Sequence, residues 1–170
     1  RNQDCLTIPT NVIIMPKEKL RVSKIEGGTV IDHIPSGRAL TVLDILGITP
    51  ETDDTVSILM NVPSGKYEKK DIVKVEGREL GEEEINKLAL TAPEATINVI
   101  RDFEVAEKRN VKPPKKVKGI IKCSNPTCIT NASEPVTPEF EVVSNDPIRL
   151  RCTYCERITG EKNLLEQLQG

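Results

Sequence analysis

The chain has 170 residues, with 24 Lys and Arg against 26 Asp and Glu, one His, and a formal net charge of −2. Because general nucleic-acid-binding proteins normally carry a basic excess, this charge argues against that class, although it leaves local basic patches open. Aromatic residues make up only 2% of the chain, so the core is small, and a metal, disulfides or a partner subunit is expected to stabilise it.

We expect a cytoplasmic protein with no membrane contact. No apolar stretch reaches the roughly 20 residues of a membrane-spanning helix, and the N-terminus lacks the basic and apolar regions of a secretory signal. Residues 1–16 show no clear hydrophobic period, and Met15 opens "MPKEKLRV", which reads like a natural start. We therefore predict that residues 1–16 are an N-terminal extension, disordered or non-native, with an extra edge strand as the alternative.

Residues 17–108 show the pattern of a mixed α and β domain. Alternating apolar and polar residues predict strands over 20–26, 28–34, 55–62 and 70–77, and a strand or strand pair over 96–108. Two helices are predicted, over 35–47 and 81–93, the first with Ser36 as its N-cap and Gly47 as its stop. This order, β-α-β-β-α-β with one extra leading strand, predicts a ferredoxin-like two-layer α+β sandwich.

The composition changes at residues 109–118, which we predict to be a linker because they are strongly basic and include adjacent prolines. Residues 119–160 follow as short β-like runs and form the second predicted domain, a small zinc-ribbon or rubredoxin-like β domain. Residues 161–170 are expected to be a C-terminal tail, either a short amphipathic helix on a neighbour or a frayed end.

The second domain contains two cysteine pairs, Cys123-x4-Cys128 and Cys152-x2-Cys155. Two short cysteine loops can bring four soft ligands together for tetrahedral zinc, whereas disulfides are uncommon in an intracellular chain. Four thiolates leave no open coordination position, so the predicted zinc is structural and not catalytic. Metal binding would then provide much of the folding free energy of this domain.

His33 is the only histidine of the chain, and Asp32 beside it completes the one candidate acid–base pair. Because adjacent strand residues point to opposite faces, we expect the two not to act on one another and predict no catalytic site. Lysines on or near the predicted strands favour a polyanion site instead, such as one for a nucleoside triphosphate; they are Lys19, Lys24, Lys74 and Lys108. Taken singly, each lysine also fits a solvated charge, and His33 fits a structural residue at a strand end.

Four motifs follow one another along the chain: "GGTVIDHIPSG", "NVPSGKYEKKDIVKVEG", "LALTAPEATINVIRDFEV" and "KCSNPTC…RCTYCE". Together they resemble the regulatory chain of aspartate carbamoyltransferase, from about residue 19 to residue 156. The resemblance implies a non-catalytic subunit in pyrimidine biosynthesis that binds CTP and UTP as inhibitors and ATP as an activator. It also implies a regulatory-chain homodimer, a zinc domain that docks on the catalytic chain, and a dodecamer of six catalytic and six regulatory chains.

The resemblance further implies which residues form the two sites. The implied nucleotide-binding residues are Lys19, Val22, Ser23, Lys24, Ile25, Val30, Asp32, His33, Ile72, Lys74, Asn98, Ile100, Phe103, Val105 and Lys108. The implied ligands of one structural zinc per chain are Cys123, Cys128, Cys152 and Cys155. The residues alone leave one alternative from another class, a stand-alone zinc-ribbon protein that binds nucleic acid through residues 108–122.

Overall fold

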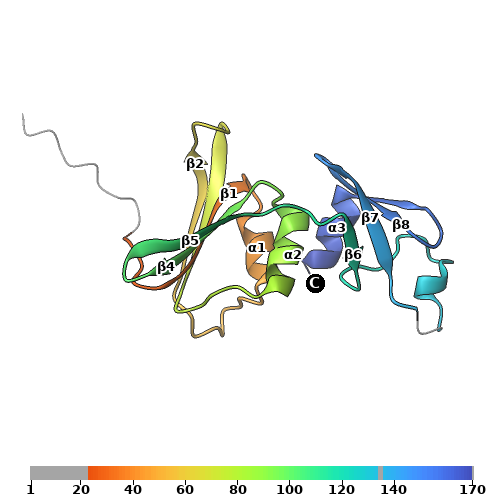
Figure 1. Cartoon of the computed structure of the whole chain (residues 1–170), viewed down its shortest axis with the longest axis horizontal. Coiled ribbons are helices and arrows are strands. Elements are labelled where there is room, and N and C mark those ends of the chain that lie inside the picture. Colours follow the sequence, from red (N-terminus) through yellow and green to blue (C-terminus); the bar gives the residue numbers. More distant parts are fainter. Residues whose placement is uncertain (1–22, 134–135, 170) are drawn as a thin grey trace, which may run out of the picture.

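The computed structural model describes residues 23–133 and 136–169 (Figure 1). The predicted extension of residues 1–16 therefore lies outside the described residues. The N-terminal part is an antiparallel sheet in the order β2-β3-β1-β4-β5. Its elements in chain order are β1 (Gly28–Pro35), α1 (Ala39–Ile45), β2 (Val56–Pro63), β3 (Lys69–Glu76), α2 (Glu82–Thr91), β4 (Thr96–Arg101) and β5 (Glu104–Asn110).

This order confirms the predicted ferredoxin-like sandwich. The first four strands and the two helices follow one another as β-α-β-β-α-β, and β5 pairs with β4 as an additional strand. The predicted segment 96–108 is thus a strand pair, joined by a turn in which Asp102 and Phe103 have positive φ.

The extra leading strand predicted over 20–26 is wrong for the residues that the structure describes. Residues 23–26 form no strand, and residues 20–22 lie outside the described part. The carbonyl groups of Glu26 and Gly27 accept hydrogen bonds from the N–H groups of Phe103 and Gly77, at 2.9 Å each. Because these donors lie in turns, the segment crosses the end of the sheet and pairs with no strand of it.

Helix α1 begins later than predicted, and Ser36 is not its N-cap. The N-cap is Arg38, which makes no side-chain capping hydrogen bond. The fully buried carboxylate of Asp71, on β3, accepts hydrogen bonds from the N–H groups of Gly37 (2.8 Å) and Ala39 (3.2 Å). An acid from a distant strand thus satisfies the first amides of the helix, and Gly47 ends it with a φ of 63° as predicted.

The N-terminal core lies between the sheet and its two helices. Alternate residues of the central strands, among them Ile31, Val73 and Ile97, are buried against α1 and α2. Figure 1 shows both helices on one side of this sheet, between it and the C-terminal part of the chain. The opposite sheet face carries no helix among the described residues.

The C-terminal part is a second antiparallel sheet, in the order β6-β7-β8-β9, with one helix. Residues 161–168, expected as a tail, form that helix, and the fully buried Leu164 packs on the core of its own chain. The elements are β6 (Lys116–Lys118), the 3-10 helix η1 (Ile129–Asn131), β7 (Glu139–Asn145), β8 (Ile148–Cys152), β9 (Ile158–Gly160) and α3 (Glu161–Leu168).

The two parts of the chain share buried surface. Leu90, near the end of α2, is fully buried in the same cluster as Phe140, Leu150 and Leu164 of the C-terminal part. The side chain of Gln169, just past α3, donates to the Thr41 hydroxyl of α1 at 2.8 Å. The helices of the first sandwich therefore also pack on the C-terminal part. None of the helices that the structure describes is long and apolar enough to cross a membrane.

Candidate metal and nucleotide sites

The four cysteines of the C-terminal part form one cluster. Their Sγ atoms all lie within 4.8 Å of one another. The Cys123–Cys155 and Cys128–Cys152 pairs are 3.5 Å and 3.8 Å apart. Tetrahedral zinc with Zn–S bonds of about 2.3 Å requires S···S separations of about 3.8 Å. The cluster therefore fits a tetrahedral metal ion with four sulfur ligands.

Neighbouring groups change the acidity of these sulfurs in opposite directions. The N–H of Asn125 donates to Cys123 Sγ (3.4 Å), and the Thr130 hydroxyl donates to Cys128 Sγ (3.2 Å). Burial raises the pKa of the Cys123 thiol to about 12, whereas a hydrogen bond from the Arg157 N–H lowers the pKa of Cys155 to about 6. Because a metal must displace the proton from Cys123, its affinity is expected to rise with pH.

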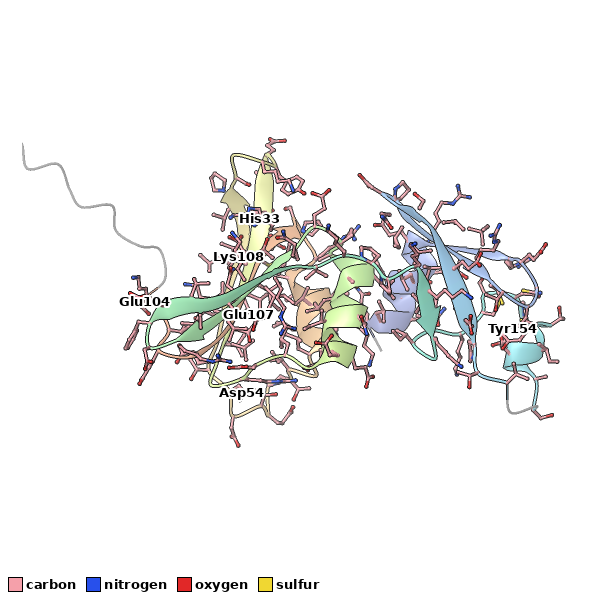
Figure 2. The ribbon with its side chains drawn as sticks, viewed as in Figure 1. His33, Asp54, Glu104, Glu107, Lys108 and Tyr154 are labelled. Atoms are coloured by element: carbon pink, nitrogen blue, oxygen red, sulfur yellow. The ribbon has the colours of Figure 1, made fainter. Side chains whose placement is uncertain are left out.

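Two exposed apolar side chains flank this cluster. Ile129 follows Cys128 in the sequence, and Tyr154 lies between Cys152 and Cys155; each is 48% exposed. Figure 2 shows Tyr154 beside the 3-10 helix. Sequence reasoning missed both residues, although their positions next to metal ligands on short loops were a usable signal. The metal would hold this apolar pair in place.

Most predicted nucleotide-binding residues lie on one face of the N-terminal sheet. Val30 is opposite Lys74 on β3 and opposite Asn98 on β4, and Asn98 is opposite Lys108 on β5. Cross-strand partners share a face, so these four side chains form a row across the sheet. We call this helix-free side the open face; by strand alternation it also carries Ile72, Ile100 and Val105.

The segment before β1 closes one end of the open face. The Lys74 ammonium donates to the carbonyl of Ser23 at 3.2 Å, which places Ser23 and the adjacent Lys24 beside the row. Ile25 is buried, and Phe103 is exposed at the β4–β5 turn. The backbone N–H of Phe103 donates to the carbonyl of Glu26. The other two predicted residues, Lys19 and Val22, lie outside the described part of the chain.

The expectation that strand geometry separates Asp32 from His33 is wrong. The pairing of β1 with β3 is irregular between Ile31 and Ile34, and His33 has a φ of 60°. This bulge breaks the alternation, so that the His33 Nδ1 lies 3.7 Å from the Asp32 carboxylate. That nitrogen is buried and has no hydrogen-bond partner among the described residues.

Lys70 belongs to the same group, although sequence reasoning missed it. Its ammonium lies 2.7 Å from the Asp32 carboxylate, and its side chain is largely buried. Lys70 precedes Ile72 and Lys74 on β3 at alternate positions, so the strand period places all three on the open face. That period was a signal in the sequence that could have found it.

The charges of the open face are predominantly positive. Lys70 is paired with Asp32, whereas Lys74 and Lys108 form no ion pair with any described carboxylate. Figure 2 shows Lys108 on β5 and His33 toward the end of β1. A face of this kind, with apolar side chains and two ammonium groups outside any described ion pair, suits a ligand that has a flat ring and an anionic tail.

A cleft of about 800 Å³ separates the end of the N-terminal sheet from the C-terminal part. His33 and Arg38 line it together with Lys69, the connecting residue Lys112, and Glu161 of α3. His33 therefore lies between the open face and the junction of the two sheets.

Comparison with known proteins identifies the family of the chain. Residues 20–112 match the family described as "Aspartate carbamoyltransferase regulatory chain, allosteric domain", and residues 115–165 match its "metal binding domain". Regulatory chains of aspartate carbamoyltransferase from Korarchaeum cryptofilum and Thermoplasma volcanium are 57% and 54% identical to it. These matches cover 91% and 89% of this chain, and 99% and 100% of the two relatives.

The family match explains why an open basic face and a four-cysteine cluster occur in one chain, since the family combines an allosteric and a metal-binding domain. A third relative, from Thermofilum pendens, is 56% identical over 89% of this chain and 96% of its own length. The chain therefore belongs to the family of aspartate carbamoyltransferase regulatory chains.

Proposed function

We propose that residues 17–108 bind CTP, UTP or ATP on the open face of the sheet, with CTP and UTP inhibiting and ATP activating aspartate carbamoyltransferase in pyrimidine biosynthesis. The observation that carries this proposal is the row of Lys74, Val30, Asn98 and Lys108 across four strands. This row contains an apolar side chain, an amide and two ammonium groups, and neither ammonium group has an ion-pair partner among the described residues.

The two ends of the open face would have different tasks. The segment 23–25 offers backbone carbonyl and N–H groups at one end, where a base edge can be read by hydrogen bonds. Lys70, Asp32 and His33 lie toward the other end, where Lys70 and Lys108 would bind phosphate oxygens. The His33 imidazole faces Asp32 with its buried Nδ1 and is 30% exposed elsewhere, so its exposed part is suited to a nucleotide contact.

The direct test is a binding and activity titration. The catalytic chain would be assembled with this chain, and the carbamoyl-transfer rate measured with CTP, UTP and ATP in turn. Calorimetry on the same complex would give the nucleotide affinities. Unchanged rates with no detectable binding would contradict the proposal, and binding without a change in rate would leave only a storage or bridging role.

We further propose that residues 119–160 bind one structural zinc and dock on the catalytic chain, and that the subunit itself performs no catalysis. Four sulfurs within 4.8 Å of one another would fill the coordination sphere of a tetrahedral ion, so that the metal would order the loops but offer no position to a substrate. The exposed Ile129 and Tyr154, on loops held by the metal, are the proposed apolar contacts with the catalytic chain.

The docking surface can be tested on the same complex. Replacing Tyr154 by Ala removes an exposed aromatic contact and should weaken the affinity for the catalytic chain about tenfold or more, since aromatic anchors dominate many interfaces. Val143, another exposed apolar residue of the C-terminal sheet, supplies the matched control, Val143→Ala. Equal affinities of the wild-type and Tyr154→Ala chains, measured by interferometry, would place the docking surface elsewhere.

A regulatory-chain homodimer is part of the proposal, within a dodecamer of six catalytic and six regulatory chains. Strand β2 is an edge of the N-terminal sheet and carries exposed Ile58 and Met60, with exposed Leu40 of α1 on the same side. An unpaired apolar edge strand is a ready site for a second copy. Sedimentation of the isolated chain, with Ile58→Lys as the disrupting variant, tests this contact.

The nucleic-acid alternative receives less support. In the basic segment 108–122, Arg109 pairs with Glu107 and Glu82, and Lys116 pairs with Glu139. These carboxylates reduce the positive potential that phosphate binding requires. We therefore do not propose a nucleic-acid function for this segment.

A further inference from the structure

The side chain of Arg38 contacts both parts of the chain. Its Nη1 donates to the carbonyl of Thr91, the last residue of α2, at 2.6 Å. Its Nη2 forms an ion pair with Glu161, the first residue of α3. Both side chains are mostly shielded, with 22% and 32% of their surface exposed. One guanidinium therefore holds ends of helices from both parts of the chain.

The position of Arg38 within its own helix is electrostatically unfavourable. It is the N-cap of α1, where the helix dipole repels a cation. Its two partners compensate, because the carboxyl end of α2 attracts a cation and Glu161 is an acid at the start of α3. The forked guanidinium can satisfy both at once, which a lysine ammonium cannot do with the same geometry.

Arg38 is also tied to the open face through β3. Lys70 binds Asp32 on the open face, and the next residue, Asp71, points to the helix side. The Asp71 carboxylate accepts the N–H groups of Gly37 and Ala39, the two neighbours of Arg38. A displacement of β3 at Lys70 would therefore move the backbone on both sides of Arg38.

We propose that Arg38, through its ion pair with Glu161, is the residue that couples nucleotide binding on the N-terminal sheet to the position of the metal-binding part. This inference rests on the proposed nucleotide function. A nucleotide that contacts Lys70 shifts β3, Asp71 carries the shift to the start of α1, and Arg38 transfers it to α3. Arg38 lies at the start of α1 on the helix side of the sheet and is not among the four cysteines of the cluster, so it acts by positioning.

The test is a double-mutant cycle in the assembled enzyme, with Arg38→Met, Glu161→Gln and both together. We expect each single variant to bind CTP within about twofold of wild-type affinity, and to lose most of the fold-change in transfer rate that CTP causes. The double variant should lose little more than either single one. Arg38→Lys, which keeps the charge but not the fork, should lose an intermediate share.

Arg151→Met is the matched control, because it removes an Arg–Glu pair of similar kind that joins neighbouring strands of one sheet, Arg151–Glu141 at 2.6 Å. Thermal unfolding of every variant separates loss of coupling from loss of fold. A full CTP response in Arg38→Met, or an equal loss in Arg151→Met, would overturn the inference. If the wild-type enzyme does not respond to nucleotides, the proposed function itself fails, which is a different outcome.

Discussion

At the scale of single residues, His33 depends on its backbone conformation. Its φ of 60° lies in the left-handed region, which few non-glycine residues adopt and which His and Asn enter more readily than most. The bulge that requires this φ directs the imidazole toward Asp32, whereas a regular strand would place the two side chains on opposite faces. A substitution at this position must therefore be chosen to keep the backbone.

Replacing His33 by Asn should keep the bulge and remove the imidazole. If the imidazole contacts the nucleotide, the Kd for CTP rises about tenfold, the usual size for loss of one charge-assisted hydrogen bond. Calorimetry on the assembled enzyme measures this Kd. His33→Gly also accepts the positive φ and should weaken binding to a similar degree. An unchanged Kd in both variants would assign His33 a structural role.

The strand period could have predicted Lys70 but not the position of His33. Lys70, Ile72 and Lys74 alternate along one strand, and their common face follows from the sequence alone. The bulge after Ile31 arises from the pairing of β1 with β3, which brings together residues about 40 positions apart in the chain. Local pattern carries no information about such an irregularity.

At the scale of elements, Asp71 on β3 connects the start of α1 with the bulge in β2. Its carboxylate accepts the amides at the start of α1 and also the N–H of Asn61, at 2.9 Å, where β2 has its own bulge. The sequence placed Asp71 in a strand but could not reveal that its side chain caps a helix from another element. The prediction of Ser36 as N-cap failed for this reason.

Replacing Asp71 by Asn should lower the free energy of unfolding by about 2–3 kcal/mol, because the buried site loses its charged acceptor and gains an amide donor among other donors. Urea denaturation measures the change. Asp44→Asn, at an exposed position of α1, should alter the unfolding free energy by less than about 0.5 kcal/mol. Equal stabilities of the Asp71→Asn and wild-type chains would show that the carboxylate is not essential to α1.

At the scale of the whole molecule, the small core predicted from composition is divided into two clusters that meet at α2. Leu90 lies on α2 of the first sandwich, but its side chain packs in the core of the C-terminal part. A metal held by the cysteine cluster would replace apolar volume in that second core, because three of the four cysteines are buried within it. Sequence spacing predicted that the four cysteines come together, since short loops fix the separation within each pair, whereas the shared cluster depends on how the two sheets meet.

Removing the metal should therefore unfold the two parts unequally. After chelation, amides of β7 and β8 are expected to lose protection from hydrogen exchange, because the loops that carry Cys128 and Cys152 no longer converge and metal binding supplies folding free energy. Amides of β1 and β3 should stay protected by their own core, while the last turn of α2 loses protection where Leu90 loses its cover. Cys152→Ser should reproduce this pattern and bind no zinc. Cys5→Ser, which changes the one cysteine outside the two pairs, should keep one zinc per chain. Unchanged exchange in β7 and β8 after complete zinc loss would show that the apolar cluster alone holds the C-terminal sheet.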